Sequence, residues 1–152
     1  TKERMYSVLN PQNKARCFRI GEIYLMKFNG RAHEQQGWRP GLVFQNNTGN
    51  QYSPNIIALP LTSSLKKRSQ PTHVFIPAND DTKLKKDSMV LCENPECISK
   101  DRIGSYITTL PDQYMSQVTI ANLLATSSIS FINPEELITT WEKSLVLNSV
   151  SF

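Results

Sequence analysis

Residues 33–50, HEQQGWRPGLVFQNNTGN, combine groups that can bind an anion with a segment that can hold them in place. Pro40 disfavours helical dihedral angles at the residue before it, so we expect Arg39 to be extended at the start of a strand. The apolar run 41–44 that follows is typical of a buried strand. The guanidinium of Arg39 would then lie beside a loop of hydrogen-bonding side chains, which predicts an anion-binding site.

Six short segments carry the apolar and β-branched residues that favour strands. We expect strands within residues 20–28, 41–44, 55–61, 72–76, 88–92 and 102–110. Residues 46–50, between the second and third segments, predict a turn, because asparagine and glycine tolerate left-handed dihedral angles. Pro60 cannot donate to a backbone ladder, so it predicts that the third strand lies at an edge or contains a bulge.

Two helices are expected after the strands. The first begins near Pro111, with Asp112 favourably placed against the helix dipole. Its apolar face has approximate helical spacing and comprises Tyr114, Val118, Ala121, Leu124 and Ala125. The second begins at Asn133, a cap residue followed by proline, and its apolar face comprises Leu137, Ile138, Trp141 and Leu145. The order of elements predicts a mainly β, α+β domain: a bent antiparallel sheet or partly open barrel with a helix packed on it.

Length and charge predict one domain with short extensions. A chain of 152 residues can bury a single core of useful size. Residues 1–19 contain five basic residues and one acidic residue, which accounts for the whole net charge of +4. Because the remainder is neutral, binding to nucleic acid would depend on individually placed contacts or on this basic segment.

Cysteine and histidine residues are few. Cys17, Cys92 and Cys97, taken with His33 and His73, do not reproduce the ligand spacing of a zinc site, so we expect no metal and no other cofactor. Unpaired cysteines favour a reducing, cytoplasmic setting. No apolar run is long enough to cross a bilayer, and residues 1–10 lack the apolar centre of a secretory signal.

Short motifs follow one another in a fixed order along the domain. They are Gly21-Glu22-Ile23-Tyr24, Glu34-Gln35-Gln36-Gly37-Trp38-Arg39-Pro40, Val43-Phe44-Gln45-Asn46, Ser53-Pro54, Leu61-Thr62, Pro71-Thr72-His73-Val74, Asp87-Ser88-Met89-Val90-Leu91 and Arg102-Ile103. Together they resemble the MazF/PemK family of toxin endoribonucleases, most closely its Gram-positive branch. The resemblance covers a toxin domain at 19–132, which leaves a basic N-terminal extension at 1–18 and a helical C-terminal extension at 133–152.

The resemblance implies a fold, an activity and partners. Members of this family adopt a small SH3-like barrel, also called the CcdB-like fold, and form homodimers. They cut single-stranded RNA, usually mRNA, at short sequences without a metal ion, and a cognate antitoxin protein neutralises them by occupying the RNA groove. Attack by the 2′-hydroxyl of the RNA on the adjacent phosphate would leave a 2′,3′-cyclic phosphate and a 5′-hydroxyl end.

The resemblance also implies catalytic residues. Arg39 and Thr62 match the arginine and threonine that the family ties to catalysis. Two parallel hydrogen bonds from Arg39 would stabilise the extra charge on the phosphate, and the hydroxyl of Thr62 can donate to the same group. By residue type alone, the alternatives are a loop-anchoring salt bridge for Arg39 and a strand-end cap for Thr62.

His33 is the candidate for proton transfer, because histidine side chains titrate near neutral pH; a solvated loop histidine is the alternative. Glu34 is expected either to position the 2′-hydroxyl or to fix its loop. Some members of the wider family carry a catalytic arginine after the fifth strand, and Glu96 stands at that place here. This difference argues against a mechanism with two arginines and predicts an altered base preference.

The remaining candidates are side chains that can hydrogen-bond or stack RNA bases: Glu34, Gln35, Gln36, Trp38, Asn46, Ser63 and Asn94. Trp38 is equally consistent with a place in the core or the dimer interface. The basic clusters 66–68 and 83–86 are candidates for guiding backbone phosphates, although such runs are more often solvated hairpin tips.

Two other functions stay open at this point. The same barrel would bind RNA or the antitoxin without cutting RNA if the change at Glu96 removes the chemistry. Alternatively, it would act on a protein, as gyrase-poisoning relatives of this architecture do. Those relatives lack an arginine–threonine pair, so Arg39 and Thr62 argue against a protein target.

Overall fold

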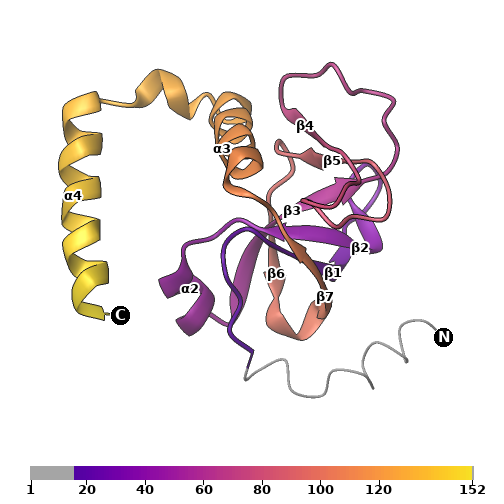
Figure 1. Ribbon diagram of the computed structural model, residues 1–152, viewed down its shortest axis with the longest axis horizontal. Helices are drawn as coiled ribbons and strands as arrows, with labels where there is room; N and C mark the ends of the chain where they lie inside the picture. The colour runs from indigo at the N-terminus through magenta and orange to yellow at the C-terminus, as the bar shows by residue number, and fades with distance from the viewer. Residues whose placement is uncertain (1–15, 152) are drawn as a thin grey trace.

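Seven antiparallel strands form one strongly bent sheet in the computed structural model, which describes residues 16–151 (Figure 1). The elements are β1 (Glu22–Asn29), β2 (Gln36–Val43), α2 (Asn47–Tyr52), β3 (Asn55–Thr62), β4 (His73–Ile76), β5 (Ser88–Leu91), β6 (Glu96–Ser99), η2 (Lys100–Arg102), β7 (Ile103–Thr109), α3 (Asp112–Ala125), η3 (Ser128–Phe131) and α4 (Pro134–Ser151). The strand order is β4-β5-β3-β2-β1-β7, and β6 pairs with β3.

The sheet curls because two of its strands do not keep a single register. The pairing of β1 with β7 shifts on either side of Tyr24, and such irregularities bend a strand. β3 pairs with β6 through residues 55–58 and with β5 through residues 61–62. The predicted small, partly open barrel with C-terminal helices is therefore confirmed.

Pro60 lies within a central strand, so the prediction that it places the third strand at an edge is wrong. On one side it faces Gly41 of β2. On the other side it falls between Ala58, which pairs with β6, and Leu61, which pairs with β5. The missing N–H thus comes where β3 changes partners and the ladder is already interrupted.

Two further elements differ from the prediction. Residues 47–52 form α2 instead of a turn, because Oδ1 of Asn46 accepts a hydrogen bond of 2.8 Å from the backbone N of Gly49 and caps the helix. β6 has no counterpart in the prediction, because Ile98 is its only buried residue and no apolar alternation marks it. The other predicted strands and both helices are present, although β2 begins earlier, at Gln36.

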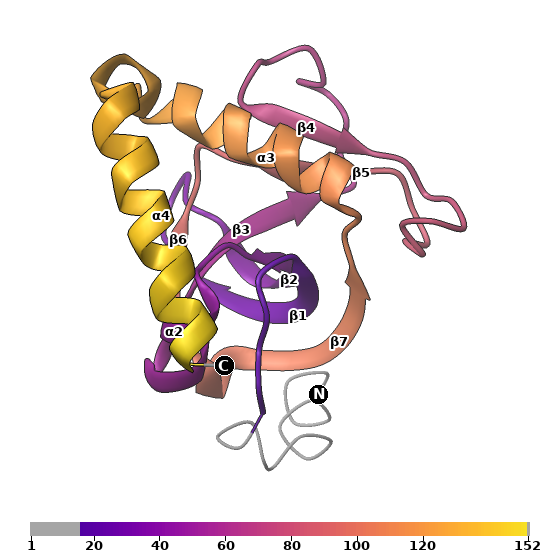
Figure 2. The ribbon, with the colours of Figure 1, turned by 60° about the vertical axis from the view of Figure 1, so that its left-hand side comes forward.

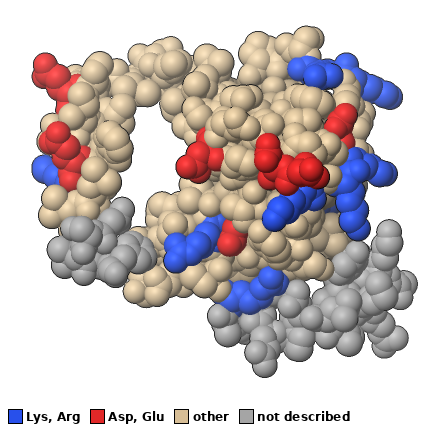
Figure 3. Space-filling view, viewed as in Figure 1, with Lys and Arg blue, Asp and Glu red and all other residues tan. Residues whose placement is uncertain are grey.

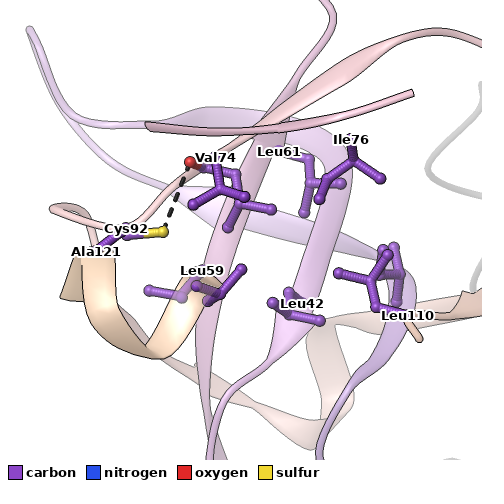
Figure 4. Close-up of a cluster of buried hydrophobic side chains, with 11 residues drawn as sticks. Leu42, Leu59, Leu61, Val74, Ile76, Cys92, Leu110 and Ala121 are labelled. Atoms are coloured by element: carbon purple, nitrogen blue, oxygen red, sulfur yellow. Dashed lines mark hydrogen bonds between the residues drawn. The ribbon is translucent and has the colours of Figure 1, made fainter. Parts of the chain in front are cut away.

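Two apolar clusters pack against the sheet. The first lies between the sheet and α3, which crosses one face of the sheet (Figure 2), and it includes Leu42, Leu59, Leu61, Val74, Ile76, Cys92, Leu110, Val118 and Ala121 (Figure 4). The second includes Tyr24, Met26 and Phe28, whereas Ile23 belongs to the first, as the alternation of a strand requires. A side chain at Gly41 would clash, since a Cβ there would lie 2.5 Å from Sδ of Met26.

The two ends of the described chain behave differently. The predicted extension 1–18 lies outside the described residues except for 16–18, where Phe18 is fully buried in the second cluster. At the other end, α4 stands apart from the sheet, and Figure 3 shows open space between it and the rest of the molecule. Leu137, Trp141 and Leu145 of α4 are 54%, 63% and 52% exposed. No helix within residues 16–151 is long and apolar enough to cross a bilayer.

Candidate active site

The loop between β1 and β2 is held in a fixed shape by its own hydrogen bonds. The backbone N of Gly30 donates to the carbonyl oxygen of Gln35 at 2.9 Å, and a Cβ at Gly30 would lie 2.3 Å from that oxygen. Oε2 of Glu34 accepts from the backbone N of Arg31 at 2.7 Å. Of the two roles considered for Glu34, the structure supports fixing of the loop.

Arg39 lies in β2 opposite Met26 of β1, and its guanidinium is bound by neutral groups. Nη1 donates to Oε1 of Gln35, and Nη2 donates to the carbonyl oxygen of Gln36 at 3.2 Å. Nε is buried and has no acceptor among the described residues. Within the described chain no carboxylate forms an ion pair with Arg39, so it is not a loop-anchoring salt bridge. The guanidinium is therefore held by neutral acceptors, with one buried N–H left unpaired among residues 16–151.

Thr62 is the last residue of β3. The β2–β3 ladder ends at Gly41 and Pro60, and Arg39 and Thr62 each lie two residues beyond that pair, at the same end of the ladder. Oγ1 of Thr62 accepts from the backbone N of Ser64 at 3.1 Å, as in a strand-end cap. No other hydrogen bond of this hydroxyl occurs among residues 16–151, so its O–H can donate to the anion that Arg39 binds.

Two adjoining clefts open at Gln35, the residue that Nη1 of Arg39 binds; Thr62 lines one of them, and Arg39 itself lines neither. One, here called the acidic cleft, has a volume of about 590 Å³, and its charged or titratable lining is His33, Glu34, Glu93, Glu96 and Arg102. The other, the basic cleft, has a volume of about 350 Å³, and its lining includes Thr62, Lys66, Lys67, His73 and Glu93. Gln35, Glu93 and Asn94 line both clefts, so one extended ligand can occupy both.

His73 and Glu93 form a pair that the sequence analysis does not predict. Nε2 of His73 lies 2.7 Å from Oε1 of Glu93, and Nδ1 lies 2.9 Å from the carbonyl oxygen of Lys67. A carbonyl can only accept, so Nδ1 donates to Lys67, while Nε2 contacts the carboxylate of Glu93. The His73 side chain is only 6% exposed. The pair therefore ties the loop before β4 to the turn after β5.

Glu96 is the carboxyl whose pKa the site changes. Burial raises its pKa first, and the negative charge of Glu34 raises it further, whereas Arg102 and Arg39 oppose the shift. These interactions place Glu96 within the electrostatic reach of Arg39. The carboxylates that line the acidic cleft come from two separate segments, the β1–β2 loop and the residues between β5 and the start of β6.

The predicted residues divide into those at the clefts and those elsewhere. His33, Glu34, Gln35 and Asn94 line the acidic cleft, and Thr62 lines the basic cleft with Gln35 and Asn94. Thr62 and Ser63 also line a third cleft of about 520 Å³ with the basic cluster 83–86.

Three predicted RNA-binding residues line none of these clefts. Asn46 caps α2 instead. Nε2 of Gln36 donates to the carbonyl oxygen of Ala32 at 3.1 Å, and the backbone carbonyl oxygen of Gln36 accepts a hydrogen bond from Arg39. Trp38 is half-buried against Gly104, where an added Cβ would come within 3.3 Å of its ring. Of the two uses considered for Trp38, the structure supports burial.

Comparison with known proteins agrees with this geometry. Residues 19–124 match the family model of the PemK-like, MazF-like toxins of type II toxin–antitoxin systems. The chain belongs to this family. A relative within it, the Endoribonuclease MazF of Staphylococcus saprophyticus, is 39% identical over 101 residues, which cover 66% of this chain and 83% of the relative. The predicted resemblance to MazF/PemK toxins and their Gram-positive branch is therefore confirmed.

Solved structures of MazF proteins share the fold. MazF from Deinococcus radiodurans is 24% identical with a TM-score of 0.64, and the match covers 74% of this chain and 98% of that one. A mycobacterial endoribonuclease in complex with its cognate antitoxin is 24% identical with a TM-score of 0.61, and the match covers 72% of this chain and 95% of that one. The barrel that carries Arg39 and Thr62 is thus the MazF fold.

Proposed function

We propose that this protein is the toxin of a type II toxin–antitoxin system and cuts single-stranded RNA, mRNA above all, at specific short sequences without a metal ion. The observation that carries the proposal is that Arg39 and Thr62 lie just beyond the same end of the β2–β3 ladder, with Thr62 lining the basic cleft and Arg39 bound to Gln35, which lines both clefts. The hydroxyl hydrogen of Thr62 is unpaired among the described residues, and Nη1 of Arg39 becomes available to a phosphate when it leaves Gln35. Membership of the toxin family and the name of the staphylococcal relative support the same activity.

In this mechanism the 2′-hydroxyl of one ribose attacks the adjacent phosphorus, and the bond to the 5′-oxygen of the next nucleotide breaks. Arg39 stabilises the charge that develops on the phosphate oxygens, and Thr62 donates a hydrogen bond to the same group. To reach the phosphate, the guanidinium exchanges its contact with Gln35 for phosphate oxygens. The leaving 5′-oxygen takes up a proton from water, so the products are a 2′,3′-cyclic phosphate and a 5′-hydroxyl.

Proton transfer is assigned to His33 in this proposal. It is exposed at the acidic cleft, and no hydrogen bond to its ring occurs among the described residues. The ring nitrogens of His73, in contrast, are both occupied, by Lys67 and Glu93. A ring with free nitrogens can take the proton of the 2′-hydroxyl, whereas one locked between two acceptors holds its loop in place.

The same proposal includes partners and location. We infer a cytoplasmic homodimer that a cognate antitoxin inhibits by covering the clefts. A solved complex of a mycobacterial endoribonuclease with its antitoxin supports this mode of control. The domain at 19–132 would carry the activity, with the extensions 1–18 and 133–152 added to it.

The test is incubation of the purified protein with single-stranded RNA in the presence of EDTA, followed by analysis of the RNA ends. We expect site-specific fragments with cyclic phosphate and 5′-hydroxyl ends. Arg39→Ala removes the phosphate-binding group, whereas Arg19→Ala, an exposed arginine outside the clefts, is the matched control. Tight binding of RNA that stays intact would instead favour a binding module, and growth arrest without any RNA cleavage would favour a protein target.

A further inference from the structure

The acidic cleft contains one carboxylate that is not used by the protein itself. Oε2 of Glu34 holds the backbone N of Arg31 at 2.7 Å, and Oε1 of Glu93 holds His73 at 2.7 Å. The carboxylate of Glu96, in contrast, has no hydrogen-bond or ion-pair partner among residues 16–151, although it is partly buried. Its two oxygens are therefore available to a ligand in the cleft.

The charges of the two clefts indicate which part of an RNA strand each one receives. Lys66 and Lys67 line the basic cleft with Thr62, so that cleft suits the phosphate backbone. Three carboxylates line the acidic cleft, and they would repel a phosphate. A base carries no charge and presents N–H groups, so it is the part of the strand that fits the acidic cleft. Because the clefts share Gln35 and Asn94, a base can enter one while its phosphate stays in the other.

We propose that Glu96 reads the base in the acidic cleft and selects guanine. This rests on the proposed RNA-cleaving function and names one element of its specificity. A carboxylate offers two parallel acceptors. Only guanine presents two adjacent donors, N1–H and N2–H, on its Watson–Crick edge; adenine, cytosine and uracil each place an acceptor next to every donor. The bidentate pairing thus distinguishes guanine from the other three bases.

The surroundings of Glu96 support a reading role over a structural one. It begins β6, where backbone pairing with Ala58 of β3 fixes its position without help from the carboxylate. The positive charges of Arg39 and Arg102 act on the carboxylate without forming an ion pair with it in the described chain. A carboxylate that burial disfavours gains from two donated hydrogen bonds. Glu96 is therefore a specificity-determining residue, and removing its charge leaves Arg39 and Thr62 in place.

The experiment compares base selection by the full-length protein and by Glu96→Gln. A random single-stranded RNA pool is cleaved, and the new ends are sequenced to find the enriched positions. Oligonucleotides are then made with guanine, inosine or adenine at the enriched guanine, since inosine lacks the N2 amine. Asp101→Asn is the matched control, because it makes the same charge change at an exposed residue outside the acidic cleft.

For the wild type we expect one enriched guanine at a fixed distance from the cut. Replacement by inosine should lower kcat/KM by about 10-fold and replacement by adenine by roughly 100-fold, as for lost base contacts of this kind. Glu96→Gln should cut the three oligonucleotides at rates within about threefold of each other, because the amide replaces one of the two acceptors with an NH₂ donor and no longer matches the two donors of guanine. Asp101→Asn should keep the wild-type preference.

Several outcomes would overturn the inference. Enriched positions without guanine, or an unchanged preference in folded Glu96→Gln, would remove Glu96 from base reading while leaving the nuclease assignment intact. A variant altered only in its inhibition by the antitoxin would show that the acidic cleft binds protein. Failure of the wild type to cut any RNA would overturn the proposed function itself. If circular dichroism shows Glu96→Gln to be unfolded, Glu96→Asp replaces it as the test variant, because it keeps the charge. Glu96→Asp should still favour guanine, though more weakly. Equal cleavage of all three oligonucleotides by folded Glu96→Asp would count against the inference.

Discussion

The acidic and basic clefts share a wall but differ in charge and in how their side chains are held. In the basic cleft, His73 is fixed between Lys67 and Glu93, and the lysine side chains supply positive charge. In the acidic cleft, Glu96 is free of partners within the described chain. The difference teaches that one face of a small barrel can offer ammonium groups in one cleft and an unpaired carboxylate in the next.

Arg39 lines neither cleft and is linked to them through its neighbours. Its guanidinium bonds to Gln35, which lines both, and its charge acts on Glu96. In the proposed mechanism, Arg39 receives the phosphate that lies between the base and the rest of the backbone. Five predictions test this comparison.

The largest effect is expected from Arg39→Ala. Loss of a preorganised donor to the reacting phosphate should lower kcat/KM for RNA cleavage by about 10²- to 10³-fold or more. Arg39→Lys should not restore the rate, because an ammonium lacks the fork that binds two phosphate oxygens. Circular dichroism should show both variants folded, since backbone pairing with Met26 holds this part of β2. Cleavage by Arg39→Ala at the wild-type rate would remove Arg39 from the mechanism.

His73→Leu should lower the free energy of unfolding, because it removes the contact that ties two loops together. It leaves Glu93 and the carbonyl of Lys67 without their partner, which should cost roughly 1–3 kcal/mol of unfolding free energy. Urea denaturation measures this loss, and His33→Leu, an exposed histidine, is the control, with an expected change within about 0.5 kcal/mol.

A double variant tests whether His73 and Glu93 stabilise each other. His73→Leu combined with Glu93→Leu should recover part of the lost stability, because it removes the orphaned carboxylate as well. Additive losses in the double variant would contradict an interaction between the two side chains.

Lys66→Gln combined with Lys67→Gln should weaken RNA binding without changing base preference. Each lost phosphate contact should reduce the slope of log K against log salt by about 0.7, the value for single strands. Fluorescence anisotropy with a single-stranded oligonucleotide across a salt series measures this, and Lys143→Gln on α4 is a control far from both clefts. An unchanged slope would mean that the basic cleft does not carry the backbone.

The smallest effect is the pH dependence of stability at Glu96. Burial raises its pKa above the ordinary value of 4.5, so the folded state favours the protonated form. The stability that Glu96 contributes is fully present when the pH is below the ordinary pKa, and it is lost as the pH rises through the raised pKa of the folded state. Urea denaturation across this range should therefore show the wild type losing stability relative to Glu96→Gln with rising pH. If the difference in stability between the two proteins did not change with pH, or changed in the opposite direction, it would contradict a raised pKa for Glu96 in the acidic cleft.

Much of the fold could be predicted because local patterns carry it. Asn133 caps α4 as predicted, and Pro134 is the first residue of the helix. Oδ1 of Asn133 accepts hydrogen bonds from the backbone N of Glu135 at 3.0 Å and of Glu136 at 3.1 Å. Pro60 shows the limit of such rules. The missing N–H of Pro60 is tolerated in a central strand because the partner of β3 changes there from β6 to β5. That change depends on the positions of β5 and β6 and not on the residues next to Pro60 in the sequence.

The candidate site shows the same limit. The motif around Arg39 predicted an anion-binding group, and the arginine does keep free donors. Asn46 has the same chemistry as a base-reading residue, yet it caps α2, because capping satisfies a nearby backbone N–H. His73 and Glu93 are far apart in sequence, and no local pattern links them before β4 pairs with β5.

The sequence by itself determined the family, six of the seven strands, the two C-terminal helices, and the arginine and threonine proposed for the chemistry, because motifs and periodicities are properties of neighbouring residues. Only the tertiary structure decided that Glu34, Glu93 and Glu96 line one cleft while Lys66 and Lys67 line another. It also decided which carboxylate is left without a partner. The reason is that contacts across a curled sheet are set by strand register and by where each strand changes partner, and no single segment encodes either.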